Sequence, residues 1–244
     1  MFAKSRMLLS IVRIVRNSSS VNFIVKPPIF SIHSRTVMSA AKQQQKILVA
    51  VVGVGLVGSE FVNQLLSIPP QVSPFKLVSL TSSSRSLFTG KETPIQSNAS
   101  WKSLLATSNA SADLKALTSQ LTQLVAEKER VALVDNTSSE DVAALYPVWL
   151  KEGINVITPN KKAFSGDAQL FAEIVATSRE SGARFLNEAT VGAGLPVIAP
   201  LKELLATGDK VRPVTLILFF MGLLICIIDH QNRGCFLRNN ELYL

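Results

Sequence analysis

The chain has 244 residues, 47% of them hydrophobic, which is enough to bury a core in one or two domains and excludes a disordered protein. Its formal net charge of +8 is unevenly placed. The first 46 residues hold eight Lys and Arg and no Asp or Glu, whereas the remainder has 17 basic and 17 acidic residues. The folded part therefore has no net positive field for phosphate backbones, and nucleic acid is not an expected partner.

Residues 1–45 are expected to lie outside the fold. They are rich in Arg and Ser, and apolar residues alternate with Arg13 and Arg16, a composition typical of a transit peptide. If this basic leader is a targeting signal, the expected location is mitochondrial, and the sequence leaves this undecided against a cytoplasmic one. A leader without function is the alternative, and initiation at Met38 would give a cytoplasmic form.

The cysteines and histidines do not form a recognisable metal-binding motif. The chain has two of each, and Cys226 and Cys235 are both near its end. No zinc site is predicted from these spacings. An ion held by backbone carbonyls stays open.

A glycine-rich turn at Gly53, Gly55 and Gly58 directly follows the apolar stretch 47–52. This spacing is typical of dinucleotide sites: the first glycine permits a tight turn, the second lets the backbone approach a pyrophosphate, and the third lets the next helix pack closely. Apolar residues at helical spacing follow until Pro69, and a second β-rich run covers 75–80, which completes a βαβ unit. Dinucleotide binding is favoured over an ordinary glycine turn.

The polar stretch 81–86 follows this second strand, where NAD-selective sites place an acidic residue. It has hydroxyl groups and Arg85 instead, and these can accommodate the 2′-phosphate of NADP. NADP(H) is therefore favoured over NAD(H). The alternative is a solvated Ser-rich turn.

The rest of the chain to Val211 repeats the pattern of helix and strand. Strands are predicted at 131–135, 154–158 and 184–187. From Asn98 a loop is predicted, followed by a helix with a leucine stripe from Leu114. The next helix is predicted from about Ser139 to Gly153 with a break at Pro147, and a third ends at Gly182. The predicted fold class is α/β, a Rossmann-type doubly wound parallel sheet spanning 46–211.

Polar residues follow two of these strands. Thr137 and Ser138 lie where ligands collect in open α/β sheets, although Ser138 with Asp141 also fits a helix cap. Lys161 and Lys162 follow the next strand, and at most one of these adjacent side chains is expected to face a crevice. A solvated lysine pair is the alternative.

Four motifs together resemble homoserine dehydrogenase, in particular its fungal-type monofunctional form. They are 53–58, 134–139, 158–164 and the glycine-rich turn 188–196, in the order found in that family. The resemblance implies NAD(P)H-dependent reduction of L-aspartate 4-semialdehyde to L-homoserine, on the route to threonine, methionine and isoleucine, by direct hydride transfer with a general acid. It implies a homodimer for full-length members, which we do not extend to this chain.

The resemblance also assigns roles to residues. It implies that Lys161 reaches the nicotinamide and substrate region, and that Thr137, Ser138 and the turn bind cofactor, the turn through Gly53, Val54, Gly55, Leu56, Val57 and Gly58. The resemblance also implies a sodium ion bound by the main-chain oxygens of Glu188, Val191, Ala193 and Leu195. Because backbone carbonyls need no particular side chain, such a site leaves no ligand motif in the sequence.

The resemblance ends at Val211. The substrate and dimerisation domain is expected to be missing or incomplete, together with the family's main catalytic Lys and Asp, and 212–244 forms a divergent apolar tail. Its longest apolar run, 214–228, is shorter than the roughly twenty residues that span a bilayer, so no membrane helix is predicted. The hypotheses are an active enzyme, an inactive cofactor-binding fragment left by truncation or mis-splicing, and, less favoured, a tail-anchored membrane protein.

Overall fold

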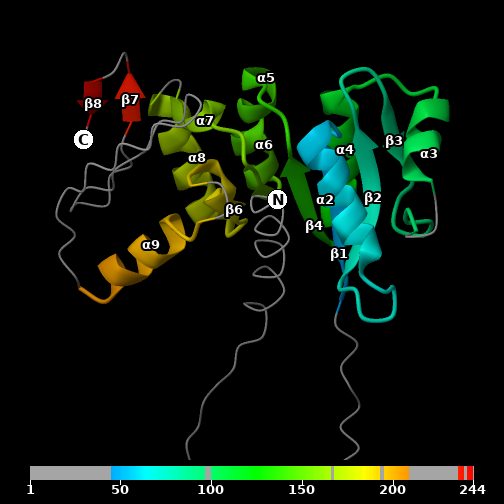
Figure 1. Cartoon of the computed structure of the whole chain (residues 1–244), viewed down its shortest axis with the longest axis horizontal. Coiled ribbons are helices and arrows are strands. Elements are labelled where there is room, and N and C mark those ends of the chain that lie inside the picture. The colour runs from blue at the N-terminus through cyan, green and yellow to red at the C-terminus, as the bar shows by residue number, and fades with distance from the viewer. Residues whose placement is uncertain are drawn as a thin grey trace, which may run out of the picture.

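The computed structural model describes residues 45–96, 100–165, 168–192, 195–208, 236–238 and 241–243. Its centre is a six-stranded sheet in the order β3-β2-β1-β4-β5-β6 (Figure 1). The strands are β1 Ile47–Val52, β2 Phe75–Thr81, β3 Ser86–Phe88, β4 Arg130–Asp135, β5 Asn155–Ile157 and β6 Phe185–Leu186. A separate antiparallel pair is formed by β7 Phe236–Arg238 and β8 Glu241–Tyr243.

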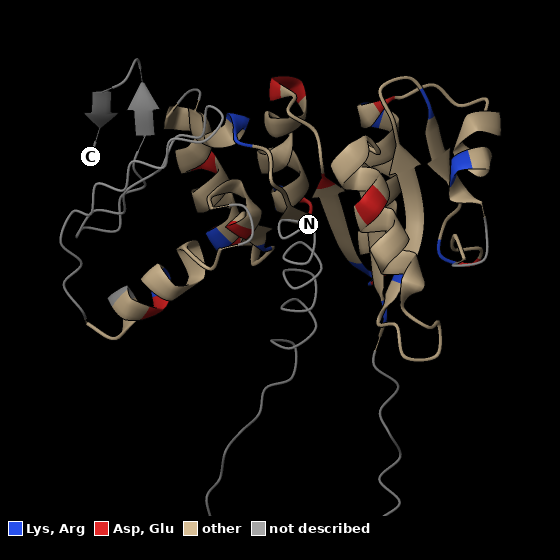
Figure 2. Cartoon of the chain, in the orientation of Figure 1, with Lys and Arg blue, Asp and Glu red and all other residues tan. Residues whose placement is uncertain are grey.

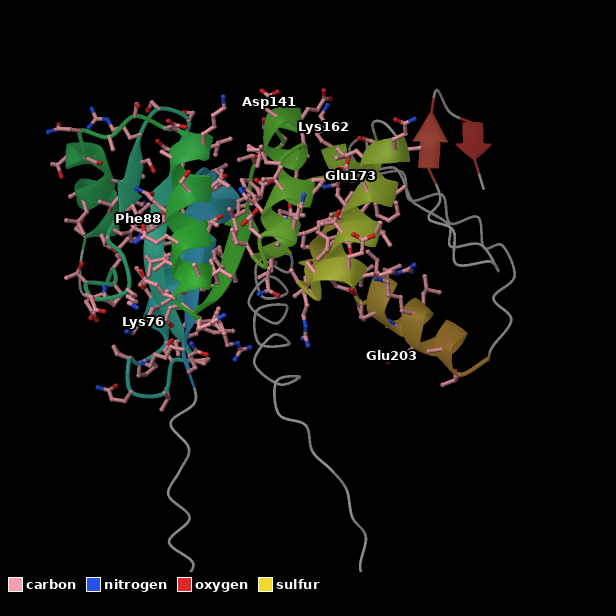
Figure 3. All side chains as sticks on the ribbon, turned by 180° about the vertical axis from the view of Figure 1, so that it is seen from behind. Lys76, Phe88, Asp141, Lys162, Glu173 and Glu203 are labelled. Atoms are coloured by element: carbon pink, nitrogen blue, oxygen red, sulfur yellow. The ribbon has the colours of Figure 1, made fainter. Side chains whose placement is uncertain are left out.

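Helices cover both faces of this sheet, as the apolar strands require. The helices are α2 Leu56–Ser67, α3 Trp101–Thr107, α4 Leu114–Ala126, α5 Glu140–Ala143, α6 Tyr146–Lys151, α7 Lys162–Ser165, α8 Ala168–Ser181 and α9 Ile198–Ala206. Figure 1 looks onto α2, and Figure 3, from behind, looks onto α4. Each face of the sheet therefore has its own apolar core.

Strand β1 supplies both cores in alternation. Val49 and Val51 pack with Phe61 of α2, whereas Leu48 and Ala50 belong to the core under α4, α6 and α8. Successive side chains of a strand point to opposite faces, and all six residues of β1 are buried because helices cover both faces of the sheet. A period-2 signal is therefore absent from this strand, and an unbroken apolar run takes its place.

The sheet is parallel except at one edge. β1 pairs in parallel with β2 and β4, and β4, β5 and β6 continue in parallel. β3 runs antiparallel to β2, because the turn Ser82–Arg85 is too short for a parallel crossover. The predicted doubly wound sheet is confirmed as a mixed, mainly parallel one, and the Ser-rich stretch forms a hairpin turn.

Several element predictions need correction in detail. The helix predicted from Ser139 to Gly153 is two short helices, α5 and α6, and Pro147 lies in the first turn of α6, where a proline is tolerated. The break falls before Pro147, at Ala144 and Leu145. Helix α3 lies in a stretch that was predicted as loop.

Some sequence predictions fall outside the described residues. These are the leader as far as residue 44, most of the tail 212–244, and Ala193 of the predicted sodium site. Within the part of the chain that the structure describes, no helix is long and apolar enough to cross a membrane. Acidic and basic residues are interspersed along the described elements (Figure 2).

Candidate cofactor site

The glycine turn joins the end of β1 to α2, and two of its glycines are required by the protein itself. Gly53 has φ +85°, and a Cβ there would lie 2.7 Å from Cγ2 of Thr137. A Cβ at Gly58 would lie 1.9 Å from the carbonyl oxygen of Gly53. Both positions therefore exclude any side chain, because the neighbouring atoms belong to the turn and to the loop after β4.

Gly55 differs from these two glycines. Apart from its chain neighbours, no described atom lies within 4 Å of a Cβ built there, and its φ of −67° suits any residue. No described side chain caps α2, its first turn holds no acidic residue, and Leu56 is 94% exposed. The start of α2 is therefore open to solvent, with no described side-chain cap on its backbone amides and no acidic residue in its first turn, an arrangement that suits an anion.

This turn lies at the point where the strand order reverses. Gly53 N donates to the Thr81 carbonyl of β2 at 2.8 Å, and Asn136 N donates to the Val52 carbonyl at 2.8 Å. The carboxyl ends of β1, β2 and β4 therefore meet around Gly53. Open α/β sheets bind ligands at such a switch point.

A pocket of about 430 Å³ opens beside Val54 and extends toward the Ser-rich turn. Arg85 and Lys102 bring two positive charges to its lining, together with the hydroxyl of Ser82. Ser82 Oγ accepts a bond from Arg85 N at 2.9 Å, which shapes the turn, and Arg85 Nη1 donates to the Ser108 carbonyl at 3.4 Å. The Arg85 side chain is exposed at the pocket and remains a predicted cofactor residue.

Lys102 was not found by sequence reasoning. It lies on α3, and its Nζ is 5.5 Å from the centre of the Trp101 ring, while Trp101 Nε1 donates to Oδ1 of Asn63 on α2 at 3.0 Å. This bond holds α3 against α2 and so brings Lys102 to the pocket. A single lysine on an unpredicted helix leaves no motif in the sequence.

The loop after β4 is shaped by Asp135, which is fully buried. Its Oδ1 accepts from Thr137 N at 2.7 Å, and Thr137 Oγ1 accepts from Ser139 N at 3.2 Å. Ser139, and not Ser138, caps α5, because its Oγ accepts from Val142 N at 3.4 Å. This corrects the predicted cap by one residue and leaves the exposed Ser138 side chain without that role.

Asp135 also belongs to a buried polar network that joins β4 to β5. Tyr146 of α6 donates its hydroxyl to Oδ2 of Asp135 and lies 2.9 Å from Thr158 Oγ1. Asn160 Nδ2 donates to the same Oδ2 at 3.0 Å. Burial, and next the Asp135 charge, raise the pKa of Tyr146 far above its ordinary value, so this phenol stays a donor.

The lysine pair divides between two environments. Lys162 Nζ forms an ion pair with Glu140 Oε1 of α5 at 2.7 Å, and Figure 3 shows Lys162 near α5 and Asp141. The hydrogen bond from Lys162, with its charge, lowers the pKa of Glu140. Lys161 precedes α7, has an exposed side chain, and forms no ion pair with any residue that the structure describes.

The predicted sodium turn follows β6. Glu188 lies in a single 3₁₀ turn, Glu188–Thr190, and its Oε1 accepts from Ala199 N of α9 at 3.2 Å. Gly192 has φ +68°, and Leu195 N donates to its carbonyl at 2.8 Å. Val191 and Leu195 are described and Ala193 is not, so the sodium site stays a prediction.

Comparison with known proteins identifies the family. A family model described as the NAD-binding domain of homoserine dehydrogenase matches residues 53–188. The chain is 43% identical over 171 residues to the homoserine dehydrogenase of Emericella nidulans, covering 69% of this chain and 46% of the relative. With the Saccharomyces cerevisiae enzyme it shares 39% identity over 166 residues, 68% of this chain and 45% of that one.

Solved structures share the fold. A Candida auris protein of unknown function is 41% identical with a TM-score of 0.60, over 68% of this chain and 45% of that one. The homoserine dehydrogenase of Thermoplasma acidophilum, at 18% identity and a TM-score of 0.50 over 67% of this chain and 49% of that one, shares the fold. The chain thus spans about half the length of these relatives. It belongs to the homoserine dehydrogenase family, which it matches through the NAD-binding domain.

Proposed function

We propose that this chain binds NADP(H) and takes part in the homoserine dehydrogenase reaction, the reversible reduction of L-aspartate 4-semialdehyde to L-homoserine. The observation that carries the proposal is the contrast among the three glycines. Protein atoms leave no room for a side chain at Gly53 and Gly58, whereas Gly55 faces open space at the start of α2. A turn built only for packing has no use for a glycine at position 55, because an alanine would fit there.

The residues around this turn fit a dinucleotide phosphate. The first turn of α2 offers backbone amides to the pyrophosphate, and Arg85 and Lys102 offer paired cations to the 2′-phosphate of the adenosine ribose. Among the residues that the structure describes, no acidic residue lines this pocket. Without a carboxylate to repel it, the 2′-phosphate is accommodated, and NADP(H) is preferred over NAD(H).

Thr137, Ser138 and Lys161 lie beyond this turn, after β4 and β5. We assign them to the nicotinamide half of the dinucleotide, with Lys161 closest to the substrate. The bound cofactor supplies or accepts the hydride. The exposed ammonium of Lys161 attracts the substrate carboxylate and orients it by charge.

The domain unit and the sodium ion belong to the same proposal. Residues 46–211 form the cofactor-binding unit, and main-chain oxygens of Glu188, Val191, Ala193 and Leu195 hold the ion. The left-handed conformation of Gly192 supports this, because it turns the chain directly after Val191. Sodium, like calcium, prefers oxygen ligands, which backbone carbonyls provide.

The test is a fluorescence titration with NADPH and NADH, followed by an assay of homoserine-dependent NADP⁺ reduction. We expect saturable NADPH binding, weaker NADH binding, and, if turnover is present, its loss in Lys161→Ala. Binding without turnover supports the inactive-fragment hypothesis, and no binding of either nucleotide contradicts the proposal. Repeating the titration in potassium chloride instead of sodium chloride tests the ion; identical affinity and melting temperature in both salts count against it.

A further inference from the structure

Asn160 is a buried amide at the start of the lysine loop, and none of the comparisons assigns it a role. It is 2% exposed. Its Nδ2 donates to Asp135 Oδ2 at 3.0 Å and to the Ser139 carbonyl at 2.9 Å, and its Oδ1 accepts from Lys162 N at 3.0 Å. One side chain therefore joins the loop after β4 to the loop after β5.

The chemistry of this site requires an amide. Two donors are needed on one side, for a carboxylate and a carbonyl, and one acceptor on the other, for a backbone N–H. A carboxylate at position 160 would oppose the buried charge of Asp135 and supply no donor. An apolar side chain would leave the Lys162 amide without this partner, and the Ser139 carbonyl would keep only its longer bond from Ala143 N, at 3.3 Å.

These bonds fix the backbone on both sides of Lys161. Before it, Asn160 N donates to Thr158 Oγ1 at 2.8 Å, and after it, Lys162 N is held by the Asn160 side chain. The Lys161 carbonyl accepts from Phe164 N at 2.9 Å and from Ser165 N at 3.0 Å. The main chain of Lys161 is thus constrained while its side chain stays exposed.

The same carboxylate that receives Asn160 also sets the cofactor loop. Asp135 Oδ1 accepts from Thr137 N at 2.7 Å, and its Oδ2 accepts from Asn160. The distance between the Thr137 loop and the Lys161 loop is therefore set by two hydrogen bonds to one buried carboxylate, that of Asp135.

We propose that Asn160 is a positioning residue, which holds the Lys161 backbone at a set distance from the Thr137 loop and so lets Lys161 engage the nicotinamide half of the cofactor. This rests on the proposed function, since it gives Lys161 a ligand. Asn160 itself touches neither cofactor nor substrate.

The test is a double-mutant cycle read by NADPH titration. Asn160→Ala is expected to weaken NADPH binding about tenfold, the scale of one well-placed charge-assisted hydrogen bond. In the Lys161→Ala background the same change should alter the affinity less than about twofold, because the group that Asn160 positions is gone. An equal loss in both backgrounds, or no loss in either, overturns the proposal.

Tyr146→Phe is the matched control. It removes the buried hydrogen bonds of the phenol to Asp135 Oδ2 and to Thr158 Oγ1 but leaves the three side-chain bonds of Asn160 in place. It should lower stability and leave NADPH affinity within about twofold of the original chain. If it weakens binding as much as Asn160→Ala does, the effect is general damage to the network, and the proposal fails.

Amide hydrogen exchange separates this inference from the proposed function, because it needs no cofactor. The Lys162 amide should be protected in the original chain and in Tyr146→Phe, and should exchange faster in Asn160→Ala, or in Asn160→Ser if the alanine variant does not fold. Unchanged Lys162 protection overturns the positioning role. A chain that shows this loss of protection but never binds NADPH contradicts the proposed function alone.

Discussion

Arg85 and Lys102 approach the pocket from different elements, one from the hairpin turn after β2 and one from α3. Arg85 was predicted because it follows a recognisable strand, at the position where such sites select their nucleotide. Lys102 was not, because its place depends on the contact between Trp101 and Asn63 across two helices. Local spacing in a sequence reports neighbours along the chain, and a tertiary contact of this kind leaves no local signal.

At this scale we predict that Arg85→Ala and Lys102→Ala each weaken NADPH binding about tenfold, because each removes a charge-assisted contact with the 2′-phosphate. NADH binding should change less than about twofold in either variant, since NADH has no such phosphate. Isothermal titration with both nucleotides measures this.

Lys76→Ala is the control for net charge. Lys76 lies on β2, and Figure 3 shows it at the opposite end of the sheet from Lys162. This variant should bind both nucleotides as the original chain does. An equal loss of NADPH affinity in all three variants would indicate a diffuse charge effect and contradict a 2′-phosphate site.

Among the elements, β1 and α2 were predictable because one motif carries both the strand and the close contact of the helix with it. Elsewhere the pattern was less informative. Ser138 and Ser139 are equally good caps by residue type, and the choice depends on Asp135, whose bond to Thr137 N sets the loop before α5. The buried network of Asp135, Tyr146 and Asn160 was likewise missed, because its members are 11 and 25 positions from Asp135 in the chain.

The contact of α2 with the turn leads to a stability prediction. Gly58→Ala should destabilise the chain by at least about 2 kcal/mol, since a Cβ 1.9 Å from the Gly53 carbonyl forces backbone to move. Urea unfolding followed by fluorescence of the buried Trp149 measures this. A midpoint equal to that of the original chain would contradict the packing described here.

At the scale of the whole molecule, the order of the strands brings together loops that are far apart in sequence. β1 lies between β2 and β4, so that the glycine turn, the Ser-rich turn and the Thr137 loop meet at the carboxyl ends of these three strands. The fold class was predictable because each parallel strand of the sheet and each long helix has a recognisable apolar pattern in the sequence. The antiparallel β3 was not, since a three-residue edge strand has too few residues to show a pattern.

The central claim is that position 55 is a glycine so that a ligand can approach, whereas position 58 is a glycine because the protein itself leaves no room for a side chain. The most direct measurement is therefore an NADPH titration of Gly55→Ala, paired with its urea unfolding curve. We predict stability within about 1 kcal/mol of the original chain, as expected for an alanine at an open helix start, and loss of NADPH binding because the methyl group occupies the approach to the phosphates. A Gly55→Ala chain that is stable and binds NADPH with unchanged affinity would contradict the account.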